Sequence, residues 1–168
     1  MSIITISDFK GEQSIAQTSN AGVIESTQIF IDKYEKKFLK SLLGNALYID
    51  FVNGLLQDPI DQKWIELRDE TDLKDMLVNY IYYWYDRNKT TTTNGVSETK
   101  GKTENSVVVN NIDKQVRSWN EMVDMARLFD LSTATYPNFV RQHWRNYSYW
   151  YFGCRVDEIF YKITRSNI

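Results

Sequence analysis

The run Tyr80–Arg87, YIYYWYDR, decides how this chain is expected to fold. It belongs to a segment, residues 72–88, in which apolar side chains recur at spacings of three and four. That spacing predicts an α-helix with an apolar face. Tyr82 and Tyr83 extend the apolar surface around the helix. Because a helix that is apolar over most of its circumference is normally central to a core, we expect this one to lie at the centre of a small, mainly α-helical bundle.

Similar patterns lie on both sides of the aromatic run. Residues 24–43 repeat the apolar spacing, and the charged side chains between the apolar positions predict a solvated face: Asp32, Lys33, Glu35, Lys36 and Lys37. Gly44 suits the position after this helix, and Asn45 can cap the next one. The predicted helices are 24–43, about 45–57, 61–68, 72–88 and about 111–128, with one more short helix beginning at Pro137.

The composition predicts one domain, residues 1–168, because 42% hydrophobic and 14% aromatic residues are ample material for a single core. A net charge of −2 argues against a protein that binds by neutralising nucleic-acid phosphates or an anionic membrane. The single cysteine excludes an intramolecular disulfide. The chain shows neither a signal peptide nor about 18 consecutive apolar residues, so we expect a soluble protein. The aromatic residues suit a core of large side chains or subunit contacts, and both interpretations stay open.

A polar segment, Asn88–Asn111 (NKTTTTNGVSETKGKTENSVVVNN), follows the aromatic run. It is open to three interpretations: a disordered linker, a surface loop or a partner-binding arm. Asn94 and Gly95 form the dipeptide most typical of a tight hairpin turn, and Val107–Val109 favours a strand. We therefore predict a protruding β-hairpin arm, about residues 89–110, whose exposed edge can pair with another chain.

The C-terminal tail, residues 146–168, is rich in side chains that favour strands. Tyr147, Tyr149 and Tyr151 alternate, which is typical of an extended segment. We predict an extended tail, and a helix over residues 154–163 is the competing interpretation.

No pattern in the sequence indicates catalysis, a cofactor or a metal ion, and we expect none of the three. The only histidine, His143, and the only cysteine, Cys154, are interpreted as packed side chains. Four carboxylates cluster at a predicted helix start, where acidic groups stabilise the helix dipole: Asp69, Glu70, Asp72 and Asp75. An alternative function comes from residues 141–155, which mix three arginines with aromatic rings. This alternative is a small helical module that contacts nucleic acid through that segment.

The order of these segments resembles the head–tail connector (adaptor) proteins of tailed bacteriophages. The resemblance is greatest to connectors of phages that infect Bacteroidetes, including crAss-like phages. It rests on the pattern LLGNALYID, Leu42–Asp50, and on the aromatic helix Tyr80–Asn88 followed by a threonine-rich arm. It covers roughly residues 24–128 and contains no catalytic motif.

The resemblance implies a structural virion protein without enzymatic activity, made in the host cytoplasm and located at the head–tail junction. Such proteins form a ring, commonly dodecameric, that joins the portal protein to the next tail or neck ring. DNA passes through the lumen during ejection without specific binding, and no membrane is involved. We expect the arm and the tail to contact neighbouring copies or the portal, through Thr91, Thr93, Asn94, Gly95, Val107, Val108, Val109, Tyr149, Trp150 and Tyr151.

Overall fold

The structure is a computed structural model that describes residues 2–15, 19–89, 92–94, 97–99, 112–129 and 160–164. Its elements follow one another along the chain with few long connections between them. They are the 3₁₀ helices η1 (Ile6–Asp8) and η2 (Gly11–Gln13), the helices α1 (Ala21–Leu43), α2 (Asn45–Leu55), α3 (Gln62–Asp69), α4 (Thr71–Lys89) and α5 (Ile112–Leu128), and the strands β1 (Thr92–Asn94) and β2 (Ser97–Thr99).

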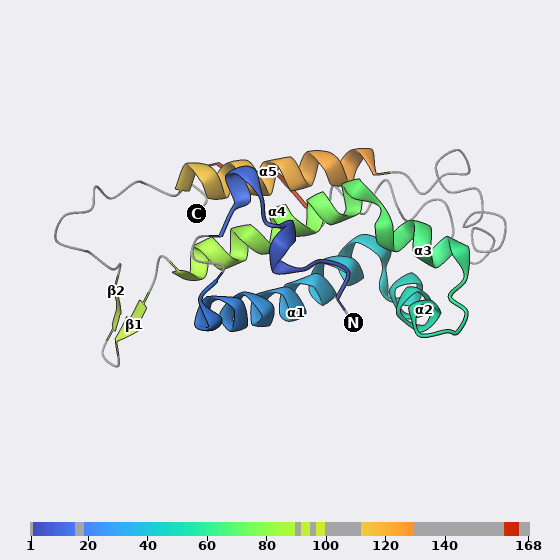
Figure 1. Cartoon of the computed structure of the whole chain (residues 1–168). Helices are drawn as coiled ribbons and strands as arrows, with labels where there is room; N and C mark the ends of the chain where they lie inside the picture. The colour runs from blue at the N-terminus through green and yellow to red at the C-terminus, as the bar shows by residue number, and fades with distance from the viewer. Residues whose placement is uncertain are drawn as a thin grey trace.

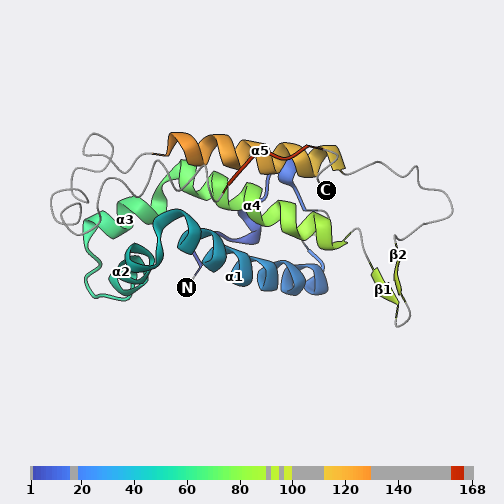
Figure 2. The ribbon, with the colours of Figure 1, turned by 180° about the vertical axis from the view of Figure 1, so that it is seen from behind.

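Helix α4 lies between α1 and α5, and both views show α1 and α5 on opposite edges of it (Figures 1 and 2). The short helices α2 and α3 close one end of this layer. The side chains of α4 are buried on almost every side of the helix, including Leu73, Met76, Leu77, Tyr80, Ile81, Tyr82, Tyr83 and Tyr85. The prediction of a mainly α-helical fold is therefore confirmed, with the aromatic helix at its centre.

Aromatic rings connect the three long helices across the core. The ring of Tyr80 on α4 lies 5.1 Å from that of Phe38 on α1 and 5.8 Å from that of Trp119 on α5. Phe160 packs on both Tyr80 and Phe38 from residues 160–164. This segment crosses the molecule on the side shown in Figure 2. Large side chains thus fill the core, as one of the two interpretations of the composition requires.

Residues 160–164 are attached to α5 by side-chain hydrogen bonds to the backbone. The indole Nε1 of Trp119 donates to the carbonyl oxygen of Tyr161 over 2.7 Å. Asn120 accepts from the Ile163 amide at 2.9 Å and donates to the Ile163 carbonyl at 3.1 Å. These residues are not helical. The remainder of the predicted tail lies outside the described residues.

Several helix boundaries differ from the predicted ones. Helix α1 begins at Ala21, because Asn20 caps it by accepting a hydrogen bond from the Gly22 amide at 2.9 Å. Asn45 is not a cap: it is the first residue of α2, and Gly44 occupies the cap position without a side chain to bond the helix. The predicted cap was wrong because one glycine ends α1 and begins α2, which leaves no residue between the two helices.

Gly44 adopts a backbone conformation that other residues avoid, with φ at 77° and ψ at 159°. We expect Gly44→Ala to lower the free energy of unfolding by about 2 kcal/mol, because a Cβ atom is strained in this region. Asn45→Ala is the matched control, and we expect it to change stability by less than about 0.5 kcal/mol because that exposed side chain caps nothing. Urea unfolding measures both; equal losses for the two variants would contradict the prediction.

The predicted β-hairpin arm, about residues 89–110, is not confirmed. Strands β1 and β2 pair antiparallel over only three residues each, and such a short two-stranded ladder is marginal on its own. Asn94 ends β1 as the partner of Ser97, whereas we predicted it in the turn. Val107–Val109 lies outside the described residues. No strand occurs in the described part of the helical body, residues 2–15, 19–89 and 112–129.

Candidate interaction site

The N-terminal residues 2–15 form a strap that crosses α4 on the side facing the viewer in Figure 1. Buried apolar side chains hold the strap against the helices: Ile4, Phe9 and Ile15. Near its end, Gln13 donates a hydrogen bond to the Asn79 side chain on α4 at 2.8 Å. Glu12 forms an ion pair of 2.7 Å with Arg117 on α5. The sequence predicted only a short helical turn here, so the strap is a structural element that sequence reasoning missed.

Glu35 on α1 fixes the beginning of the strap. Its carboxylate accepts a hydrogen bond of 2.5 Å from the Ser2 hydroxyl and one of 3.2 Å from the Ile3 amide. The Ile4 amide adds a longer bond of 3.4 Å. Glu35 is only 7% exposed. Its assignment to a solvated face was therefore wrong: it lies four residues after Ile31 and four before Leu39, on the buried stripe of α1.

Burial raises the pKa of the Glu35 carboxyl group, and this outweighs the hydrogen bonds from Ser2, Ile3 and Ile4, which favour the charged form. The Ser2 hydroxyl has one proton and lies 2.8 Å from the Ile4 carbonyl oxygen as well as close to Glu35. A protonated Glu35 would donate to Ser2, and Ser2 would then donate to Ile4. The neutral carboxyl group thus satisfies every polar atom of this contact.

We expect the stability of the wild type, relative to Glu35→Gln, to fall as the pH rises above the ordinary glutamate pKa of about 4.3. The folded state holds the Glu35 proton more tightly than the unfolded state, so stability is lost through the pH window between the two pKa values. The loss is about 1.4 kcal/mol for each unit that separates them. Urea unfolding from pH 4 to pH 7 (about the range in which a raised carboxyl pKa falls) measures the difference.

The exposed Glu25 on the same helix supplies the control, Glu25→Gln, for loss of one carboxylate from α1. A relative stability of the wild type that rises with pH would mean that the hydrogen bonds, and not burial, dominate at Glu35.

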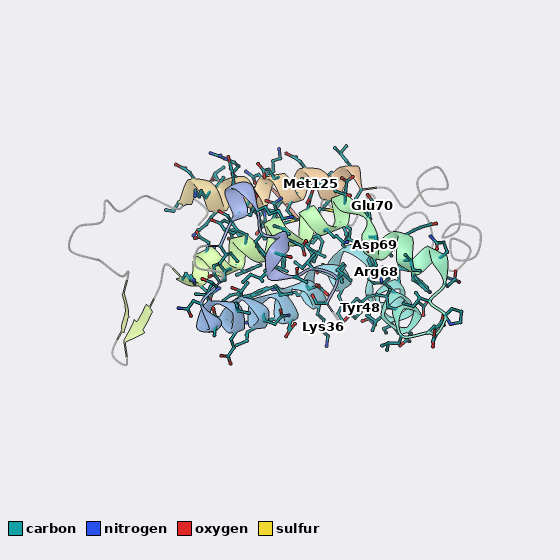
Figure 3. The ribbon with its side chains drawn as sticks, in the orientation of Figure 1. Lys36, Tyr48, Arg68, Asp69, Glu70 and Met125 are labelled. Carbon is teal, nitrogen blue, oxygen red and sulfur yellow. The ribbon has the colours of Figure 1, made fainter. Side chains whose placement is uncertain are left out.

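Two hollows lie beside the strap. One, of about 340 Å³, lies between the strap, α1 and α2, and Lys36 and Tyr48 border it (Figure 3). The other, of about 470 Å³, lies between the strap, α4 and α5, and both Asp69 and Met125 line it (Figure 3). Within the described residues, no group of three or more His, Cys, Asp or Glu side chains is arranged to hold a metal ion. Among the described helices, none is long and apolar enough to cross a membrane.

Carboxylates gather where α3 meets α4, and we call Asp69, Glu70, Asp72 and Asp75 the acidic junction. Asp69 pairs with Arg68 at 2.7 Å and with Lys74 at 3.4 Å, and the hydrogen bond from Arg68 lowers its pKa. Burial and the neighbouring Asp72 raise the pKa of Asp75. Glu70, Asp72 and Asp75 form no ion pair with the residues that the structure describes. The junction therefore presents net negative charge.

Lysines gather on the outer side of α1, and we call Lys33, Lys36, Lys37 and Lys40 the lysine row. Three of their ammonium groups lie over aromatic rings: Lys33 over Tyr34 at 5.0 Å, Lys37 over Trp84 at 5.2 Å and Lys40 over Tyr48 at 5.4 Å. None of the four pairs with a carboxylate in the described part of the chain. Like charges four residues apart destabilise a helix by about 0.2–0.5 kcal/mol per pair, so this row costs the isolated chain stability.

The predicted interface residues fall mostly beyond what the structure describes. Thr93 and Asn94 belong to β1. The others lie outside the described residues: Thr91, Gly95, Val107, Val108, Val109, Tyr149, Trp150 and Tyr151. The same holds for the segment 141–155 of the alternative function, which includes His143 and Cys154. The interface assigned to these residues stays a prediction.

No protein-family model, curated protein or solved structure matches the chain.

Proposed function

We propose that this protein is a subunit of the connector ring that joins the portal of a tailed bacteriophage to its tail or neck and continues the DNA channel. The proposal rests on the resemblance of Leu42–Asp50 and Tyr80–Asn88 to such connectors. Its partners are further copies of itself, the portal protein and the next ring of the tail or neck. Its place is the head–tail junction of the virion.

The observation that carries the proposal is that both segments of the resemblance have structural roles in one helical body. Leu42–Asp50 contains the joint between α1 and α2, in which Gly44 has a positive φ and Leu42, Leu43 and Leu47 are buried. Tyr80–Asn88 forms the second half of the central helix α4. A likeness in residues that determine the backbone and the core is stronger support for a shared fold than a likeness in surface residues.

A second argument comes from the unpaired charges. A ring is built from heterologous contacts, in which one surface of a subunit meets a different surface of the next. The lysine row and the acidic junction are two surfaces of opposite charge on one small body. A subunit with these two surfaces is suited to repeated head-to-tail association.

The proposal is tested by electron microscopy of the purified full chain, alone and mixed with the portal protein from the same genome. We expect rings, or a complex with the portal ring that places this protein between portal and tail. A chain that neither forms rings nor binds the portal would overturn the proposal. Binding of duplex DNA that is tight and falls steeply with added salt would instead favour the nucleic-acid module.

A further inference from the structure

The lysine row forms a continuous strip along one side of α1. Its members follow one another at spacings of three and four residues, which places them on the same side of a helix. Ile29 lies four residues before Lys33, on the same side, and is 60% exposed. The strip thus combines an exposed apolar side chain with four cations, and no described element covers it.

The rings beneath the strip hold its ammonium groups in place without neutralising them. Tyr34, under Lys33, stacks on Trp84 at 5.3 Å, and Trp84 lies under Lys37. A cation held over a ring keeps its full charge and loses little further freedom when it binds an anion. The row is therefore prepared for an acidic partner.

The acidic junction is the complementary surface of the same chain. Asp72 and Asp75 are exposed, lie three residues apart in the first turns of α4 and repel one another. In Figure 3, Lys36 lies on α1 and Glu70 lies at the end of α3, on different parts of the body. One copy does not bring its own two surfaces together, whereas a second copy in a head-to-tail arrangement does.

We infer that the lysine row of one copy docks on the acidic junction of the next copy. This contact rests on the proposed function, because a ring needs such a repeated contact, and it names the surfaces that make it. A nucleic acid is a poorer match for the same row. Base stacking needs exposed ring faces, and Tyr34 is only 6% exposed while Lys37 covers Trp84.

Two charge-reversal variants of the full chain test the inference: Lys33→Glu with Lys37→Glu, and Asp72→Lys with Asp75→Lys. Sedimentation at low salt over a series of concentrations measures self-association. We expect each variant alone to associate at least about tenfold more weakly than the wild type, because several close charge pairs become repulsive. We expect an equimolar mixture of the two to associate again, because each contact then joins a reversed surface to its reversed complement.

The control is Lys10→Glu with Lys114→Glu, which changes the net charge equally at two exposed lysines outside the row. We expect it to associate like the wild type. The inference is overturned if either reversal variant associates normally, if the mixture fails to recover, or if the wild type stays monomeric at every concentration. Loss of salt-dependent binding to a DNA duplex in the Lys33→Glu, Lys37→Glu variant, without recovery in the mixture, would reassign the row to nucleic acid.

Portal binding is measured on the same variants. If these variants bind the portal protein but associate normally, only the inference about the contact fails. If the wild type does not bind the portal and forms no ring, the proposed function fails.

Discussion

Tyr80→Ala is expected to lower the free energy of unfolding by about 3–5 kcal/mol, the cost typical of removing a large ring from a core. Tyr80 is 3% exposed and packs on rings from three other parts of the chain, among them Phe38, Trp119 and Phe160. Burial also raises the pKa of its phenol. Because small domains are stable by only about 5–15 kcal/mol, this single change removes a large part of the total.

Urea unfolding of Tyr80→Ala measures this loss, and Tyr161→Ala is the matched control. Tyr161 is 61% exposed, and only its backbone carbonyl accepts the bond from Trp119, so we expect its truncation to cost less than about 0.5 kcal/mol. Tyr80→Phe retains most of the ring contacts and keeps the test informative if Tyr80→Ala does not fold. Similar losses for Tyr80→Ala and Tyr161→Ala would mean that the ring network is not the centre of the core.

The helical layer could be predicted from the sequence because its signals are local. Apolar spacing within α1, α4 and α5 depends only on residues a few positions apart, and the run Tyr80–Arg87 indicated a helix buried on nearly all sides. Helix ends were less predictable. Asn20 lies in a polar stretch that resembles a loop, and the double role of Gly44 depends on how two helices meet.

The strap could not be predicted, because its contacts join distant parts of the chain. Ile4, Phe9 and Ile15 follow neither the period of a helix nor that of a strand. Ser2 meets Glu35 across 33 positions and Gln13 meets Glu121 across 108 positions. A signal for one of these contacts was nevertheless present, since Glu35 lies between Ile31 and Leu39 on the apolar stripe of α1.

The candidate interaction site was only partly visible in the sequence. The lysines of α1 were assigned to a solvated face, which is correct for Lys33, Lys36 and Lys37 as exposed residues. Their arrangement over rings depends on Trp84, which comes from a different helix. Sequence reasoning placed the interface in the arm and the tail instead, because composition identifies β-forming and aromatic segments and does not identify unpaired charges.

Gly54→Ala is expected to lower the free energy of unfolding by about 3 kcal/mol, the upper part of the range for overpacking a core. A Cβ atom at Gly54 on α2 would lie 2.0 Å from Nε1 and 2.2 Å from Cδ1 of Trp64 on α3. Trp64 is 3% exposed, packs on Phe51 and lies beneath Lys63, so its indole has no free space to enter. Alanine favours a helix over glycine by about 1 kcal/mol, so the collision must outweigh that gain.

Gly22→Ala is the matched control, because it is the same substitution inside another helix. The nearest atom to a Cβ at Gly22 is Oδ1 of Asn20 at 3.4 Å, an ordinary contact on an exposed turn. We therefore expect Gly22→Ala to stabilise the protein by up to about 1 kcal/mol, opposite in sign to Gly54→Ala. Adding Trp64→Leu to Gly54→Ala should cost less than Trp64→Leu alone costs the wild type, because the smaller side chain relieves the collision. If both glycine variants changed stability in the same direction, α2 and α3 would not approach as closely as the structure places them.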